Sequence, residues 1–285
     1  MEALYAAGPY HDTAISDKRA TGSPSVIVLC GGSGQRMGDL ASAVPKPMLP
    51  VGGRPLLWHI MRGLAEYGSQ DFVLAVGHLG HVIKDYFLRF HVHSVDFTVR
   101  LGRQPEVRSL TETPEEGWSV TCMDTGERSG TGARLKQAAR QVQRWPVVVT
   151  YGDVLADVDI DELLRFHRQH GRLATVTAAA PPARFGNLAL TGNRVHRFDE
   201  KVASAADEDL VNIGYLVLEK EAVDCFVSDD PSVMFEEQPI RDLVSAGELM
   251  AYRHSGFWLP VDSPKELASV QQRWDNDTAP WKVWK

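Results

Sequence analysis

The chain has 285 residues, of which 44% are hydrophobic and 24% charged, and its formal net charge is −7. This composition is ordinary for a globular protein with one large α/β domain or two small ones, and the negative charge argues against a general nucleic-acid-binding surface. No apolar run approaches the ~18 residues of a membrane span. Residues 1–24 lack the basic start and apolar core of a secretory signal. We expect a cytoplasmic protein whose extension 1–24 is a flexible tail or an arm that docks on a neighbouring subunit.

Strand-like and helix-like segments alternate through the first two thirds of the chain. Strands are predicted at 26–29, 71–76, 97–101, 147–151 and 174–179, and helices at 55–67, 82–90, 134–143 and 160–170. This alternation predicts an α/β fold with a Rossmann-like, doubly wound, mostly parallel sheet. Such sheets bind ligands at the carboxyl ends of their strands.

Two regions depart from the alternation. Residues 102–119 are rich in Glu, Pro and Thr, and we expect a disordered insert or a loop that covers a partner or the ligand. After residue 181 the pattern changes to short strands, at 188–190, 195–198, 211–218 and 250–253. These strands predict a smaller β-rich portion that holds a second substrate.

A glycine-rich segment follows the first strand. Gly31, Gly32 and Gly34 come directly after the apolar run 26–29, and two cations, Arg36 and Lys46, follow. Glycines let a backbone approach phosphates closely, and the cations can neutralise them. The segment fits neither the dinucleotide pattern G-x-G-x-x-G nor the P-loop. It therefore predicts a third kind of phosphate-binding loop, the alternative being an ordinary strand–helix turn with a surface arginine.

Aspartates occur at two strand ends. Asp153 follows the buried-looking strand 147–151 and a glycine, so its carboxylate should face the ligand cleft. A Mg²⁺ ion bound to a polyphosphate would compensate the negative charge there. Asp157, Asp159 and Asp161 are expected to cap the helix that begins near residue 160. Asp262 precedes Pro264 and could likewise cap a helix.

Cysteines and histidines give no metal-binding pattern. The three cysteines are scattered, which favours reduced thiols over disulfides or a zinc site. His78, His81, His91 and His93 lack the spacing of a metal site. We interpret them as surface or core histidines.

Taken in order, several motifs resemble those of the sugar-1-phosphate nucleotidylyltransferases, and within that family those of the glucose-1-phosphate cytidylyltransferases. The resemblance covers roughly residues 25–285. The segments that carry it are 31–36, 46–51, 53–61, 77–87, 124–126, 131–136, 150–153, 256–262 and 279–282.

The resemblance implies a nucleotidyltransferase (GT-A-like) fold and a role for each matching residue. Asp153 and Asp262 would hold Mg²⁺, and Glu200 would bind sugar hydroxyls while Lys201 grips the sugar phosphate. The implied catalytic residues are Arg36, Lys46 and Lys201. The implied nucleotide-binding residues are Leu29, Gly31, Gly32, Gly34, Gly77, Thr131, Gly132, Arg134 and Asp153. The implied substrate-binding residues are Gly186, Asn187, Glu200, Lys201 and Asn212.

For several of these residues the alternative is an ordinary surface or core role with no part in binding or catalysis. Glu200 and Lys201 could be a solvated surface pair, and Asn212 could be a core amide satisfied by backbone. Arg134 and Lys136 could be solvated cations on a helix face.

The resemblance implies one domain over 25–285, with a nucleotide-binding part at 25–180 and a sugar-phosphate-binding part at 181–285. It implies transfer of a nucleoside monophosphate, with CMP favoured, from a nucleoside triphosphate to a sugar 1-phosphate. We further expect a homo-oligomer, with no membrane or nucleic-acid partner. The alternatives are another base, a heptose or cyclitol phosphate as acceptor, or an inactive nucleotide-binding regulatory subunit.

Three departures from the family pattern fall in the sugar-phosphate part. Val202 follows Lys201 where the family has proline, and Ile213 stands where it has glycine. Asn187 stands where the glucose-1-phosphate enzymes have alanine. These departures leave the identity of the phosphorylated acceptor open.

Overall fold

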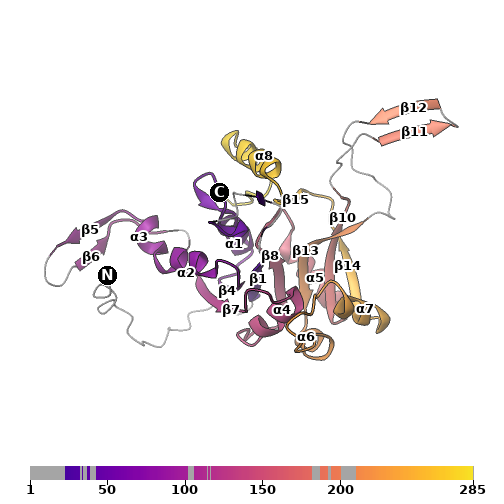
Figure 1. The fold of residues 1–285 in the computed structure, drawn as a ribbon, viewed down its shortest axis with the longest axis horizontal. Helices are drawn as coiled ribbons and strands as arrows, with labels where there is room; N and C mark the ends of the chain where they lie inside the picture. The colour runs from indigo at the N-terminus through magenta and orange to yellow at the C-terminus, as the bar shows by residue number, and fades with distance from the viewer. Residues whose placement is uncertain are drawn as a thin grey trace.

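The structure is a computed structural model, and it describes residues 23–32, 34, 37–38, 43–101, 106–113, 115, 117–181, 187–191, 194–199 and 210–284. Its centre is a seven-stranded sheet with the order β14-β10-β13-β8-β1-β4-β7 (Figure 1). The strands of this sheet are β1 (Val26–Cys30), β4 (Asp71–Val76), β7 (Ser119–Asp124), β8 (Val147–Tyr151), β10 (Ala174–Ala179), β13 (Val211–Leu218) and β14 (Leu249–Arg253).

Only β13 runs against its neighbours in this sheet. It pairs antiparallel with β8 and β10, whereas the other neighbouring strands pair in parallel. The prediction of a mostly parallel α/β sheet is therefore confirmed. The predicted strands 71–76, 147–151, 174–179 and 211–218 agree in their bounds with β4, β8, β10 and β13.

Helices cover both faces of the sheet, so the central strands β1, β4 and β8 are buried on both faces. Val26 and Val28 of β1 pack in one core with α1 (Leu56–Glu66) and α5 (Ile160–His170). Ile27 and Leu29 point the other way and pack with α4 (Thr131–Ala139), α6 (Lys220–Phe226) and α7 (Gln238–Ser245). Figure 1 shows α4, α6 and α7 together on one side and α1 on the other.

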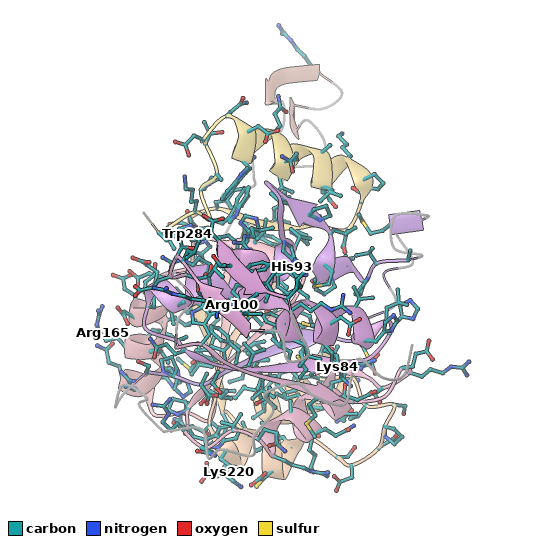
Figure 2. The ribbon with its side chains drawn as sticks, turned by 90° about the vertical axis from the view of Figure 1, so that its left-hand side faces the viewer. Lys84, His93, Arg100, Arg165, Lys220 and Trp284 are labelled. Carbon is teal, nitrogen blue, oxygen red and sulfur yellow. The ribbon has the colours of Figure 1, made fainter. Side chains whose placement is uncertain are left out.

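The chain ends on the first of these two faces. Helix α8 (Pro264–Asp275) and the segment after it bring Trp274, Trp281 and Trp284 against His59 of α1. In Figure 2, Trp284 lies among packed side chains near α8, whereas Arg165 and Lys220 lie at the periphery. The C-terminal segment is therefore part of the core.

The remaining elements are short. They are the 3-10 turn η3 (Lys46–Met48), the strand pair β2 (Pro50–Val51) and β3 (Arg54–Pro55), the helices α2 (Gly80–Leu88) and α3 (Phe90–Ser94), and the strand pairs β5 (Phe97–Arg100) with β6 (Glu106–Ser109), β9 (Val154–Ala156) with β15 (Trp258–Pro260), and β11 (Asn187–Thr191) with β12 (Arg194–Asp199). Within the described residues, no helix is both long and apolar enough to cross a membrane.

Two predicted regions differ from expectation in detail. The insert 102–119 is not wholly a loop, because β6 pairs with β5 in a ribbon apart from the central sheet. In the β-rich portion after residue 181, β13 and β14 join the central sheet, and β11 and β12 form a separate ribbon. The central sheet therefore takes strands from both predicted parts of the domain.

Candidate active site

The glycine-rich segment lies beside an open cleft at the carboxyl ends of the central strands. Leu29, Gly31, Gly32 and Asp153 line this cleft, whose volume is about 540 Å³. A side chain added at Gly32 would meet nothing within 4 Å, so its backbone borders open space. The cleft is therefore where the sequence predicts a phosphate-binding loop.

Lys46 reaches the cleft from the turn η3. Pro47 of this turn packs on Gly152, where a Cβ atom would come within 2.9 Å of the proline ring and 3.0 Å of the Cys30 sulfur. The absence of that atom lets η3 lie against the end of β8. Lys46 is thereby placed beside Asp153, with only 8% of its surface exposed.

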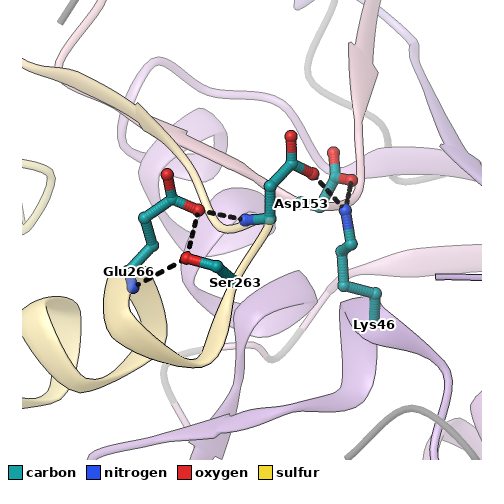
Figure 3. Close-up of polar contacts among 5 residues, drawn as sticks. Lys46, Asp153, Ser263 and Glu266 are labelled. Carbon is teal, nitrogen blue, oxygen red and sulfur yellow. Dashed lines mark hydrogen bonds and ion pairs between the residues drawn. The ribbon is translucent and has the colours of Figure 1, made fainter. Parts of the chain in front are cut away.

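Asp153 and Asp262 meet at the Lys46 ammonium. Strands β9 and β15 pair so that Pro260 lies opposite Val154, and the Val261 N–H donates to the Asp153 carbonyl at 2.8 Å. Lys46 Nζ donates to Asp153 Oδ2 at 2.8 Å and to Asp262 Oδ1 at 2.5 Å (Figure 3). The two aspartates predicted as a pair therefore converge on one point at the cleft.

Asp262 is not the N-cap of helix α8, so its side chain can bond Lys46 instead of the helix backbone. Ser263 is the N-cap, and its hydroxyl accepts from the Glu266 N–H, while the Glu266 carboxylate accepts from the Asp262 N–H at 2.7 Å (Figure 3). The alternative of Asp262 as the helix cap is therefore wrong. Of the three aspartates predicted to cap α5, Asp159 does so, because it accepts from the Glu162 N–H at 2.8 Å. Asp161 lies in the first turn, and Asp157 lies beside His254 instead.

Electrostatics keep Lys46 charged. Burial alone would lower its pKa, but the charges and hydrogen bonds of Asp153 and Asp262 outweigh burial and raise the pKa of Lys46 above its ordinary value. The site therefore holds one fixed positive charge between two carboxylates.

Arg134 joins the ends of β1, β4 and β7 from beneath the cleft, and it reaches β4 by donating to the Val76 carbonyl at 3.4 Å. Its guanidinium donates to the carbonyls of Gly31 at 3.0 Å, Gly126 at 2.7 Å and Glu127 at 3.1 Å, and to the Thr125 hydroxyl at 2.8 Å. The residue is only 4% exposed, so the alternative of a solvated cation is wrong. A side chain at Gly31 or Gly77 would collide with this guanidinium, which is one reason that both are glycine.

Comparison with known proteins decides the family. The profile described as "Nucleotidyl transferase" matches residues 25–276. The chain belongs to the nucleotidyl transferase family. This membership confirms the resemblance on which the site residues were predicted.

Two curated relatives are similar over nearly their whole length. The glucose-1-phosphate cytidylyltransferase of Salmonella typhimurium is 38% identical over 90% of this chain and 98% of its own. The probable glucose-1-phosphate cytidylyltransferase of Bacillus subtilis is 35% identical over 90% of this chain and 99% of its own.

Among solved structures, HddC from Yersinia pseudotuberculosis complexed with GMP-PN has the same fold. The structural alignment covers 88% of this chain and 99% of the HddC chain, with a TM-score of 0.63 and 18% sequence identity.

In this nucleotidyl transferase, the start of α4 is occupied by a loop from the C-terminal half. The backbone N–H groups of Gly130 and Gly132 donate to the carbonyls of Pro231 and Val233. The Thr131 hydroxyl accepts from the Phe235 N–H at 2.9 Å. Gly132, predicted to bind nucleotide, thus has its own N–H engaged within the protein, while Thr131 lines the cleft.

Sequence reasoning missed Tyr151, which lines the cleft, and Glu236, which bonds both Tyr151 and the predicted residue Thr131. Tyr151 and Thr131 both donate to the Glu236 carboxylate, which ties β8 to α4 across the opening. Glu236 follows a loop with no recognisable motif, so no sequence signal could have found it. Lys136, in contrast, lies away from the cleft and donates to the Val227 carbonyl at 2.5 Å.

The predicted acceptor side is described only in part. Asn212 is exposed at the start of β13, beside the end of β8, and its Oδ1 accepts from the Gly214 N–H at 2.9 Å. The alternative of a buried core amide is therefore wrong. Arg36, Gly186, Glu200 and Lys201 lie outside the described residues, as does the side chain of Asn187.

The donor set at Lys46 fits a magnesium ion shared with phosphates. In the part of the chain that the structure describes, no group of three or more His, Cys, Asp or Glu side chains could hold a metal alone. Asp153 and Asp262 nevertheless both point an oxygen at the Lys46 ammonium. Two carboxylates together with substrate phosphates and waters are a usual Mg²⁺ coordination set.

Proposed function

We propose that this protein transfers CMP from CTP to a sugar 1-phosphate and releases pyrophosphate. The convergence of Lys46, Asp153 and Asp262 at the cleft beside the glycine-rich segment carries the proposal. Similarity to the Salmonella enzyme over 98% of its length supports the choice of CTP and of a sugar 1-phosphate.

In the proposed reaction, an oxygen of the sugar phosphate attacks the α-phosphorus of CTP. A new P–O bond forms, and the bond from that phosphorus to the β-phosphate oxygen breaks with its electron pair leaving on pyrophosphate. Because both reactants are anions, bringing them together and neutralising their charge are the main tasks of the protein. A phosphate monoester is already largely dianionic near neutral pH, so no general base is needed.

Each cation has a place in this scheme. The buried Lys46 ammonium, kept charged by its two carboxylates, would contact the α-phosphate and the incoming oxygen. By resemblance, Arg36 would neutralise the departing pyrophosphate and Lys201 would hold the attacking sugar phosphate. No residue of the protein forms a covalent bond to the substrate.

Asp153 and Asp262 would hold the divalent cation, in our proposal Mg²⁺. When bound there, it would neutralise phosphate charge that the lysine cannot reach alone. Relatives in this family generally use a divalent metal.

Three departures from the family pattern bear on the acceptor. Val202, Ile213 and Asn187 depart from the pattern of the glucose-1-phosphate enzymes, and they fall where that pattern binds the sugar. A different hexose, a heptose or a cyclitol phosphate would fit these changes. A cytoplasmic location and a homo-oligomeric state stay predictions.

The test is a grid of nucleoside triphosphates against sugar and cyclitol phosphates, read by mass spectrometry of the product and by pyrophosphate release. We expect a CDP-linked product from at least one sugar 1-phosphate. Pyrophosphate release that the Lys46→Met variant retains would refute the assignment of the site. Absence of any product across the grid would favour an inactive regulatory subunit.

A further inference from the structure

The cleft has a second polar group beside the ends of β4 and β7, away from β8 and the Asp153 that follows it. His78, from the turn after β4, and Glu127, from the turn after β7, both line the cleft wall. His78 Nδ1 lies 3.2 Å from Glu127 Oε1. The Glu127 side chain is 72% exposed and that of His78 is 27% exposed, so the carboxylate is the more accessible of the two groups.

These two residues are fixed relative to the glycine-rich segment. The His78 N–H donates to the Gly31 carbonyl at 3.3 Å, and Arg134 donates to the carbonyls of both Gly31 and Glu127. The three strand-end turns are therefore joined through one buried arginine. A carboxylate held on such a frame can recognise a ligand, because little of its backbone freedom is lost on binding.

The position of the phosphates places the base. Asp153, which bonds Lys46, follows β8, whereas His78 and Glu127 follow β4 and β7, the second and third strands along the sheet from β8. In the proposed reaction the phosphates lie beside Asp153 and Lys46. A nucleotide that runs from there along Gly31 and Gly32 brings its base to the opposite wall, which His78 and Glu127 line. A cleft of about 540 Å³ has the size of a small-molecule site.

We propose that Glu127, held in place by His78, selects cytosine over uracil in the nucleotide. Cytosine carries an amino group at C4, which donates, and uracil carries an oxygen there, which accepts. An ionised carboxylate only accepts. It can bond the cytosine amino group, whereas the uracil oxygen would face it as a second acceptor and leave both groups unpaired.

This inference rests on the proposed function, since it assumes a pyrimidine nucleoside triphosphate in the cleft. The inference adds to the proposed function a residue, Glu127, that determines the base specificity. The alternative is that His78 and Glu127 form an ordinary surface ion pair that contributes little.

The test is the Glu127→Gln variant, measured for CTP and UTP against the wild-type protein. Glutamine keeps the shape but offers both an acceptor and a donor, so it can bond either base. We expect the ratio of kcat/KM for CTP over UTP to fall by roughly 10- to 100-fold, mainly through weaker use of CTP. Glu221→Gln on α6, another surface carboxylate away from the cleft, is the matched control and should keep the wild-type ratio.

Equilibrium binding of CTP and UTP, measured by calorimetry on the same variants, tests the inference without turnover. An unchanged CTP-to-UTP ratio in Glu127→Gln, in both binding and turnover, would overturn the inference while leaving the proposed function in place. A wild-type protein that binds CTP more tightly than UTP but forms no product would overturn the proposed function alone.

Discussion

Replacing Lys46 with methionine should open the carboxylate pair to divalent cations. In the free protein the ammonium bonds Asp153 at 2.8 Å and Asp262 at 2.5 Å, and the lysine side chain is 9% exposed. A metal ion that binds there must compete with the ammonium for the same oxygens. Wild-type protein should therefore bind the ion weakly until a triphosphate draws the lysine away.

The size of the effect follows from the two contacts. A hydrogen bond to a charged group contributes about 1.5–3 kcal/mol. The carboxylates are 28% and 19% exposed, so each contact belongs at the low end of that range. Two such contacts give about 3 kcal/mol, which corresponds to about a 100-fold change in affinity. Since the lysine need not leave both oxygens, this figure is an upper bound.

The assay is a titration of Mn²⁺ followed by electron paramagnetic resonance, with no nucleotide present. Lys46→Met should bind Mn²⁺ more tightly than wild type, and adding Asp153→Asn should remove the gain. Lys282→Met, which removes an ammonium 2.8 Å from the exposed Asp277, is the matched control. Equal Mn²⁺ affinity in wild type and Lys46→Met would refute the competition. The Lys46→Met variant should also lose orders of magnitude in turnover, while its unfolding temperature stays within a few degrees of that of wild type.

Three further predictions concern the supports of the site. Arg134→Lys should lower the free energy of unfolding by about 2–4 kcal/mol in urea titrations, because one ammonium cannot pair all the buried carbonyls. Gly152→Ala should reduce turnover at least ~10-fold with the fold kept, since its Cβ would press on Pro47 and shift Lys46. Burial lowers the pKa of His59 to about 4, so its neutral form stabilises the fold fully above pH 6.5 and progressively less as the pH falls towards 4. That loss is about 2 kcal/mol at pH 5, and a His59→Gln variant should show a flatter dependence of the urea midpoint on pH.

Most of the central sheet could be predicted from apolar runs alone. Apart from Asp71, the strands 71–76, 147–151 and 174–179 consist of β-branched or apolar residues, and their burial on both faces explains that composition. The direction of β13 could not be predicted, because an apolar strand reads the same in a parallel and an antiparallel pairing. Its place between β8 and β10 is set by long-range contacts.

The convergence of Asp153 and Asp262 was predictable only through resemblance. Asp153 directly precedes β9 and Asp262 follows β15, and the pairing of these two strands involves only three residues on each side. Three-residue strands carry no periodic signal. The family pattern therefore predicted the aspartate pair, which local sequence signals could not. The structure adds that Lys46 lies between the two carboxylates and bonds both.

Arg134 shows why the supports of a site escape a sequence reading. Its partners are mostly backbone carbonyls, which every residue has, so no motif marks them. The signal lies instead in what is missing: Gly31 and Gly77 leave the space that the guanidinium fills. A glycine that follows a strand is usually attributed to a ligand or a turn. Here a buried cation accounts for two of them, and because Arg134 is 103 residues from Gly31 along the chain, only the folded structure connects the glycines with the arginine.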